Sequence, residues 1–195
     1  MKQEILDLLH SNIAERSVGA STARGMPKGT VATARAYLAR LDLSRFSVTT
    51  EKAFQVLLDR RTQYLVKKLV NNHPAPKAQY WGRARKFLNI FLRDVLYNKY
   101  LRAAYKLDKI ERWLEVPLDS HVAHGLRREA GGHELPRFTG LKGLHSHNNT
   151  RYQKFASSVA KKKDIQRRVH LDLLYWRRAA IAAKKKPKRK SKRPR

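Results

Sequence analysis

The chain has 195 residues, which is typical of one domain or of a domain with a second small lobe, and 42% of them are apolar. Lysine and arginine number 44 against 15 acidic residues, so the net charge is +29. This surplus predicts a polyanion partner, because cations that contact a phosphate backbone release condensed counterions. We therefore expect DNA as the principal partner, with RNA as the alternative, and no small-molecule cofactor.

The chain has no cysteine, which excludes disulfides, thiolate zinc sites and cysteine-ligated iron–sulfur clusters. The first residues, MKQEILDLLHSNIAERS, are amphipathic and carry acids, so they are not typical of a secretory signal. No apolar run has the length needed to span a bilayer. We expect an intracellular protein of the cytoplasm or nucleoid, or of the nucleus in a eukaryote, with no membrane partner.

In the first half of the chain, apolar residues recur at helical spacing in three segments. The first two are 3–16 and 30–41, and the glycine-, serine- and threonine-rich stretch 17–30 between them is expected to be a mobile basic linker. The third helix begins after Thr49 or Thr50, either of which can cap it. Its inner face is expected to carry Ala53, Val56, Leu57, Tyr64, Leu65 and Leu69.

The second half opens with a break at 71–82 that contains two prolines, and the strongest helical pattern of the chain follows over 83–107. Asp119 or Ser120 can cap a later helix that ends at a glycine pair. The helices expected after 107 cover 108–115, 120–130, 149–162 and 164–183. A short strand over VHLDLLY is the alternative within the last of these. The whole chain predicts an all-α fold.

The last twelve residues, KKKPKRKSKRPR, hold nine cations and no acid, and removing them leaves +20 on the rest of the chain. We expect this tail to be disordered in isolation and to act as a nuclear address or as a nucleic-acid-binding arm. The predicted organisation is an N-terminal helix and linker (1–30), a helical nucleic-acid-binding domain (31–183) and the tail (184–195). The tail residues expected to contact nucleic acid are Lys184, Lys185, Lys186, Lys188, Arg189 and Lys190.

The string WGRARKFLNI at 81–90 places three cations, Arg83, Arg85 and Lys86, at the start of a predicted helix. The helix dipole and the neighbouring charges disfavour an ammonium there, which favours the neutral amine that attacks an electrophilic carbon and forms a Schiff base. Asp119, at a helix N-cap, has its negative charge stabilised by backbone N–H groups. An amine nucleophile beside a carboxylate suits attack at an anomeric carbon as a base departs. The other interpretations are an ordinary phosphate-facing lysine and a simple helix cap.

Two strings carry a family resemblance: G-x-x-R-K-x-x-N at Gly82–Asn89, and P-L-D-S-H-V at Pro117–Val122. Together they resemble the helix-hairpin-helix DNA glycosylases, above all the endonuclease III branch, over residues 80–127. The resemblance implies that Lys86 is the nucleophile and Asp119 the essential aspartate, with residues 80–86 as the hairpin that binds the DNA backbone. It also implies a helical fold and removal of damaged bases from a flipped-out nucleotide, with strand cleavage through a Schiff base.

The sequence therefore predicts a base-excision glycosylase or abasic-site lyase, or else a non-catalytic nucleoid or ribonucleoprotein component that only binds nucleic acid. We expect no metal site, although His121 and His124 lie three residues apart. Asp172 is interpreted as a solvated or salt-bridged helix position, and Trp176 as a core residue. The residues of the folded part expected to contact nucleic acid are Tyr80, Trp81, Gly82, Arg83, Arg85, Asn89, His121, Arg127 and Arg128.

Overall fold

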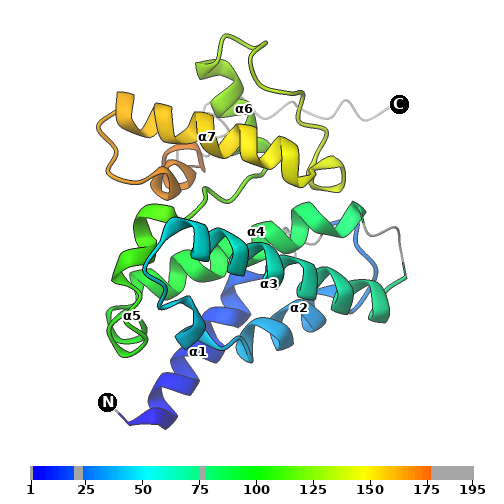
Figure 1. The fold of residues 1–195 in the computed structure, drawn as a ribbon. Coiled ribbons are helices and arrows are strands. Elements are labelled where there is room, and N and C mark those ends of the chain that lie inside the picture. Colours follow the sequence, from blue (N-terminus) through cyan, green and yellow to red (C-terminus); the bar gives the residue numbers. More distant parts are fainter. Residues whose placement is uncertain (1, 20–23, 75–77, 177–195) are drawn as a thin grey trace, which may run out of the picture.

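The computed structural model describes residues 2–19, 24–74 and 78–176. These residues form helices joined by turns and contain no strand, which confirms the predicted all-α class (Figure 1). The contacts predicted for the basic tail, 184–195, lie outside the described residues. One continuous apolar core runs through the described helices.

The first part of the chain forms four long helices that pack on one another. They are α1 (Gln3–Ser17), α2 (Thr30–Ala39), α3 (Glu51–Asn72) and α4 (Ala78–Tyr97), with the 3₁₀ helix η1 (Leu43–Phe46) between α2 and α3. α3 packs along α4, and α1 packs on both α2 and α4. The start of α3 is fixed by the predicted cap, since the Thr50 hydroxyl accepts a hydrogen bond from the Ala53 N–H at 3.2 Å.

Helix α1 belongs to the same core as the helices that follow it. Leu6, Ala14 and Val18 are buried in that core, and the His10 ring lies 5.3 Å from the ring of Phe91 on α4. The sequence placed this helix in an N-terminal region separate from the domain. The structure instead makes α1 one wall of the domain, because its buried stripe needs α2 and α4 to cover it.

The buried face of α3 differs from the predicted one. Val56 and Tyr64 were expected to point inward, but they are 52% and 51% exposed. The buried stripe instead includes Thr62, whose hydroxyl donates to the Leu58 carbonyl at 2.8 Å and so needs no water. A polar residue at the centre of the stripe hides it from a search for apolar periodicity. The residues that are buried on α3 are Phe54, Leu58, Thr62, Leu65, Val66 and Leu69.

Helix α4 begins earlier and ends earlier than predicted. Residues 80–86, which were expected to form a hairpin, lie inside this helix, so that expectation is wrong. The long helix predicted to run to 107 breaks at Asn98, whose side-chain carbonyl accepts from the N–H groups of Tyr100 and Leu101, both at 3.1 Å. Asn98 therefore caps a new short helix, α5 (Lys99–Ala104).

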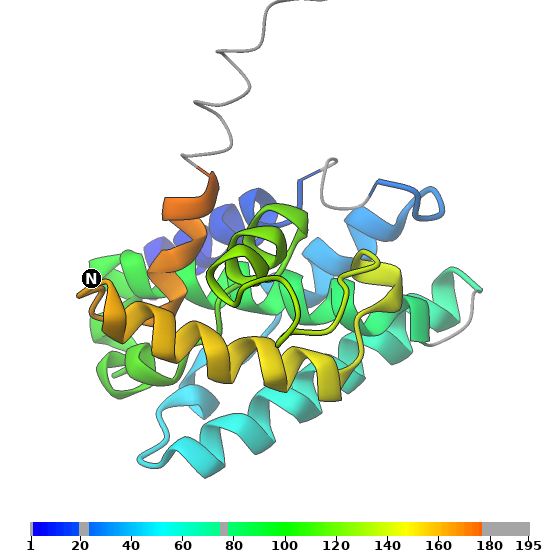
Figure 2. The same ribbon diagram turned by 90° about the horizontal axis from the view of Figure 1, so that it is seen from above.

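The second part of the chain forms a smaller group of helices on the other side of α4 and of the non-helical segment 114–119 (Figure 1). The 3₁₀ helix η2 (Asp108–Trp113) packs on α3 and α4. The elements of the smaller group are α6 (Ser120–Glu129), η3 (Leu141–Gly143), α7 (Ser146–Lys162) and η4 (Arg168–His170). Residues 171–176 are also helical and lie beside α6 (Figure 2). The alternative of a strand over VHLDLLY is therefore wrong, and the last helix begins later than the predicted residue 164.

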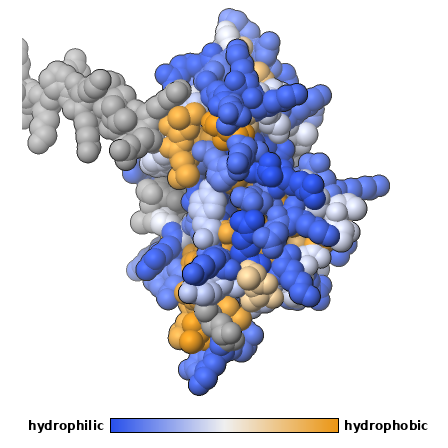
Figure 3. Space-filling view, turned by 90° about the vertical axis from the view of Figure 1, so that its left-hand side faces the viewer, coloured by the Kyte–Doolittle hydropathy of each residue, from blue (hydrophilic) through white to orange (hydrophobic). Residues whose placement is uncertain are grey.

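No helix in the described part of the chain is long and apolar enough to cross a membrane. Figure 3 shows one face of the molecule, where hydrophilic side chains cover most of the surface and apolar side chains form small separate areas. This face therefore presents mostly polar and charged groups to the solvent.

Candidate functional site

The two predicted catalytic residues meet where the two groups of helices join. The Lys86 Nζ on α4 donates a hydrogen bond to Asp119 Oδ2 at 3.0 Å, although 33 residues separate them in the chain. Both residues are largely buried, at 8% and 6% exposure. The structure thus brings together the lysine and the aspartate that the two sequence strings singled out.

The Asp119 carboxylate has a partner on each side. Its Oδ1 accepts from the backbone N–H groups of His121 and Val122, at 2.9 and 3.0 Å, so Asp119 is the N-cap of α6 as predicted. Its Oδ2 accepts from Lys86 and also from the indole Nε1 of Trp176, at 2.9 Å. Four hydrogen bonds therefore hold this carboxylate in one orientation, with Oδ2 directed at the lysine.

Lys86 and Asp119 line a pocket of about 290 Å³, close to the lower limit of ordinary small-molecule sites. Trp176, which was expected in the core, is 46% exposed at this pocket, and its ring lies 4.7 Å from that of His121. The pocket therefore combines an amine, a carboxylate and three aromatic rings. The residues that line it are Arg24, Lys86, Asp119, Ser120, His121, Phe138, Gly140, Leu141 and Trp176.

Asp172 is a second buried carboxyl group near this pair. It forms an ion pair with Arg93, two turns after Lys86 on α4, which confirms the salt-bridged interpretation. Burial raises the pKa of Asp172 to about 6, and the charge of Asp119 acts in the same direction, whereas Arg93 and Lys86 oppose the shift. A carboxyl group that titrates close to neutral pH therefore lies beside the pocket.

Arg85, the residue before Lys86, faces a different carboxylate. Its Nε and Nη2 atoms donate to the two oxygens of Glu115, both at 2.8 Å, and its Nη1 donates to Asp59 at 2.8 Å and to Thr62 at 3.0 Å. Burial alone would raise the pKa of Glu115, but Arg85 and the amides of Asn89 and Asn149 hold it below its usual value. Glu115 was not among the predicted site residues. Its one visible signal is an acid between the apolar residues of LEVPL.

Side chains from the second group of helices complete this buried cluster. The Gln153 amide on α7 accepts from the Val116 N–H and donates to the Val116 carbonyl, both at 2.9 Å. Arg168 donates to the carbonyls of Trp113 and Leu114, both at 2.8 Å. These bonds fix the segment that carries Glu115 and Asp119 between the two groups of helices.

Six residues predicted to contact nucleic acid lie in the interior, so the structure corrects their assignment. Asn89 donates to Glu115 at 3.0 Å, Tyr80 donates to the His73 carbonyl at 2.5 Å, and Arg83 donates to the Gln79 carbonyl at 3.0 Å. A phosphate cannot reach these buried groups without displacing their partners. The six residues are Tyr80, Trp81, Gly82, Arg83, Arg85 and Asn89.

The remaining predicted contacts lie nearer the surface. His121 and Arg128 are exposed on α6, and Arg127 is half-buried and donates to the Gly132 carbonyl. Lys86 is not an ordinary surface lysine, because it is buried against Asp119. Of the described residues predicted to contact nucleic acid, His121 is the one exposed side chain that lines the pocket.

The helix dipole does not act on the cation cluster at 83–86 as the sequence predicted. α4 begins at Ala78, so Lys86 lies in the third turn, beyond the first turn where the helix dipole acts. Carboxylates offset these charges instead: Glu115 and Asp59 for Arg85, and Asp119 for Lys86. Among the described residues, the partners of Arg83 are the carbonyls of Gln79 and Arg24, and burial lowers its pKa.

Within the described residues, no three histidine, aspartate or glutamate side chains are grouped so that they could hold a metal ion. Comparison with protein-family models, with curated protein sequences and with solved structures returned no significant match.

Proposed function

We propose that this protein binds DNA and acts on it at the Lys86–Asp119 pocket, as a base-excision glycosylase or abasic-site lyase. The observation that carries the proposal is the Lys86 Nζ, 3.0 Å from a fixed carboxylate oxygen at a pocket that solvent can enter. The resemblance of Gly82–Asn89 and Pro117–Val122 to helix-hairpin-helix glycosylases supports the same assignment. The net charge of +29 supports a polyanionic substrate.

In the proposed reaction, Lys86 is the nucleophile and Asp119 is the proton acceptor. Lys86 gives a proton to Asp119 Oδ2 and attacks C1′ of the sugar, while the glycosidic bond breaks and its electron pair leaves with the base. At an abasic site, the same amine adds to the aldehyde, and loss of water gives a Schiff base. Asp119 keeps its orientation throughout, because the His121 and Val122 N–H groups hold its other oxygen.

The pocket is suited to a flipped-out nucleotide. Trp176 and Phe138 supply aromatic faces on which a base or sugar can pack, and Arg24 places a cation at the pocket. Trp176 also donates to Asp119, so a nucleotide that displaced this indole would free one lone pair of the carboxylate for the lysine proton. Both aromatic side chains can therefore pack against the substrate, and Trp176 also affects how the Asp119 carboxylate accepts a proton.

Borohydride trapping tests the proposal directly. The protein is mixed with a duplex that contains an abasic site, borohydride reduces any Schiff base to a stable amine, and a denaturing gel detects the covalent complex. We expect a complex with the natural sequence, none with Lys86→Gln, and an unchanged amount with Lys52→Gln. Lys52 is exposed on α3 and provides the matched loss of one lysine charge.

Each of the other possible results contradicts one part of the proposal. A complex that persists in Lys86→Gln would assign the nucleophile to another amine. If the natural sequence forms no complex, the lyase reaction is excluded, and a panel of duplexes with damaged bases then tests a glycosylase that uses Asp119 and water. Binding of DNA or RNA with no product in either assay would leave the non-catalytic alternative, in which Lys86 and Asp119 only join the two groups of helices.

A further inference from the structure

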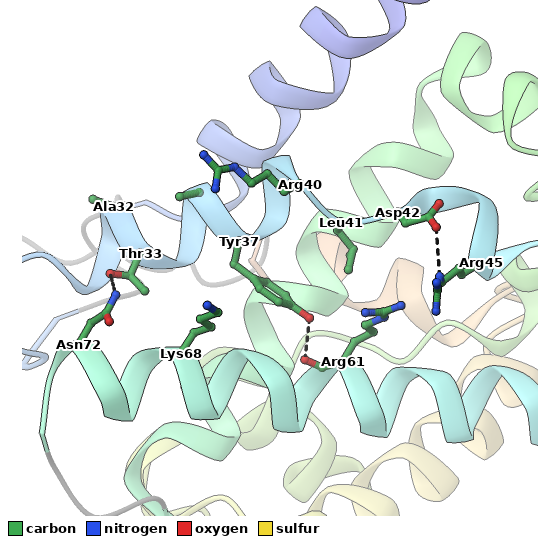
Figure 4. Close-up of a pocket in the computed structure, with 11 residues that line it drawn as sticks. Ala32, Thr33, Tyr37, Arg40, Leu41, Asp42, Arg45, Arg61, Lys68 and Asn72 are labelled. Atoms are coloured by element: carbon green, nitrogen blue, oxygen red, sulfur yellow. Dashed lines mark hydrogen bonds and ion pairs between the residues drawn. The ribbon is translucent and has the colours of Figure 1, made fainter.

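A second hollow, separate from the Lys86 pocket, runs between α2 and α3 and has a volume of about 740 Å³ (Figure 4). Its walls come from α2, from the turn that follows it and from the outer part of α3. No residue lines both this groove and the Lys86 pocket. We call it the α2–α3 groove. The residues that carry its chemistry are Tyr37, Arg40, Arg45, Arg61, Lys68 and Asn72.

The groove has more cationic than anionic groups. Among the described residues, Arg40, Arg61 and Lys68 have no carboxylate partner, and the Arg61 Nε is buried with no hydrogen-bond acceptor. The one acid in the groove, Asp42, already pairs with Arg45 at 3.1 Å. In contrast, carboxylates neutralise the buried cations Arg85, Lys86 and Arg93.

Cations that line one groove without a counter-charge repel one another, and a bound anion removes that repulsion. The groove is also shaped around them, because the Tyr37 hydroxyl donates to the Arg61 carbonyl at 3.1 Å and holds α2 against α3 at its centre. The Arg61 guanidinium packs 5.9 Å from the centre of the Tyr64 ring. These cations therefore line a groove whose two walls, α2 and α3, are held together by a hydrogen bond.

The spacing of the cations indicates the kind of anion. Arg61 and Lys68 are seven residues apart on α3, which is two helical turns and about 10 Å. A cation at each end of this span can contact a separate phosphate group. Along one strand of a duplex, phosphates follow every 3.4 Å of the axis, so the two side chains span about three nucleotides. A chain of phosphates fits this spacing.

We infer that the α2–α3 groove binds the phosphate backbone of a nucleic acid, as a contact site additional to the Lys86 pocket. This inference rests on the part of the proposed function that makes nucleic acid the partner, and it does not depend on any chemistry at Lys86. Contacts between these cations and phosphates would supply binding that is independent of base sequence. Tyr37 offers an aromatic face for a base beside that backbone.

The test compares two double variants of the full chain by the salt dependence of their binding to an undamaged duplex. The groove pair is Arg61→Gln with Lys68→Gln. The control pair is Arg60→Gln with Lys67→Gln, which removes the same charge from neighbouring exposed positions of α3 outside the groove. Fluorescence anisotropy from 50 to 200 mM salt gives the slope of log K against log salt. Thermal unfolding checks that both pairs fold.

We expect the groove pair to lower the magnitude of the slope by about 1.8, two contacts at about 0.9 each, and the control pair to leave it near that of the natural sequence. Equal slopes for the two pairs would overturn the inference while leaving binding at the Lys86 pocket untouched. If the natural sequence binds no nucleic acid at 50 mM salt, the inference and the proposed function both fail. If tripolyphosphate raises the melting temperature as strongly as the duplex does, and the groove pair abolishes that effect, the ligand is a free polyphosphate and the choice of a backbone is overturned.

Discussion

Arg85 and Lys86 are neighbours on one helix, and each forms an ion pair with a carboxylate of the segment 114–119, but the two pairs have different surroundings. Glu115 is enclosed, and Arg85, Asn89 and Asn149 saturate its oxygens. Asp119 is equally buried by exposed fraction, but it borders the pocket of about 290 Å³. The closed pair holds the two groups of helices together, whereas the open pair has room for a third molecule.

This difference shows what separates a structural ion pair from a candidate site. Burial, charge and hydrogen bonding are alike in the two pairs, so none of these properties alone indicates chemistry. The two pairs differ in whether a ligand can reach them, because only the open pair borders a pocket. We therefore expect changes at the closed pair to affect the free energy of unfolding, and changes at the open pair to affect mainly the reaction.

The largest expected effect on stability is at the closed pair. Glu115→Ala leaves the buried Arg85 guanidinium with only Thr62 and the exposed Asp59 as hydrogen-bond partners among the described residues. Removing one partner of a buried pair typically lowers the free energy of unfolding by about 3–5 kcal/mol. Urea denaturation followed by circular dichroism measures it. A loss below about 1 kcal/mol would show that the closed pair does not hold the fold together.

A pH titration tests Asp172, which lies beside the open pair. Its carboxyl group binds a proton up to about pH 6 in the folded chain but only up to about 4 when unfolded, so its contribution to stability falls as pH rises from 4 to 6. The total change is about 3 kcal/mol. Asp172→Asn should therefore gain stability relative to the natural sequence over this range, as measured by urea denaturation at several pH values. A difference between the two proteins that does not change with pH would contradict the raised pKa.

A substitution at Gly82 tests how closely α4, the helix that carries Lys86, packs against Leu141 and Leu144. A Cβ at this position would be 2.5 Å from the Leu141 carbonyl oxygen and 2.8 Å from the Leu144 Cβ. Gly82→Ala should therefore lower the free energy of unfolding by about 1–3 kcal/mol through overpacking. In a helix without such contacts, a Gly→Ala change stabilises the protein by about 1 kcal/mol. A lower melting temperature would therefore show that Leu141 and Leu144 pack closely on Gly82, and a higher one would show that they do not.

The smallest expected effect on stability is at the open pair. Asp119→Asn keeps a good N-cap for α6, and water in the pocket can solvate the Lys86 amine, so we expect a loss of about 1 kcal/mol. Under the proposed function, the rate of adduct formation should nevertheless fall by about 10²- to 10⁴-fold, because the proton acceptor is gone. A stability loss as large as that of Glu115→Ala, with adduct formation unchanged, would reverse the assignment of the two pairs.

The sequence predicted the helical class, most helix positions, and the pairing of Lys86 with Asp119, because apolar periodicity and local strings carry that information. It failed where a polar residue took a core position, as Thr62 does on α3 and Glu115 does beside Arg85. It also failed at Tyr80, whose buried hydroxyl finds a carbonyl that only the folded chain supplies. Tertiary hydrogen bonds decide such positions, and they leave no periodic signal.

Among the described residues, no strand lies beside the segment that carries both carboxylates. The Gln153 amide instead forms hydrogen bonds with both backbone groups of Val116. Asp119, at the end of this segment, has extended backbone angles. In an extended chain, residues two and four apart point the same way, so Glu115 and Asp119 reach the same helix together. A slip by one residue would present Val116 and Ser120 to Arg85 and Lys86. The Gln153 amide, together with Arg168 at the carbonyls of Trp113 and Leu114, therefore holds the register on which both ion pairs depend.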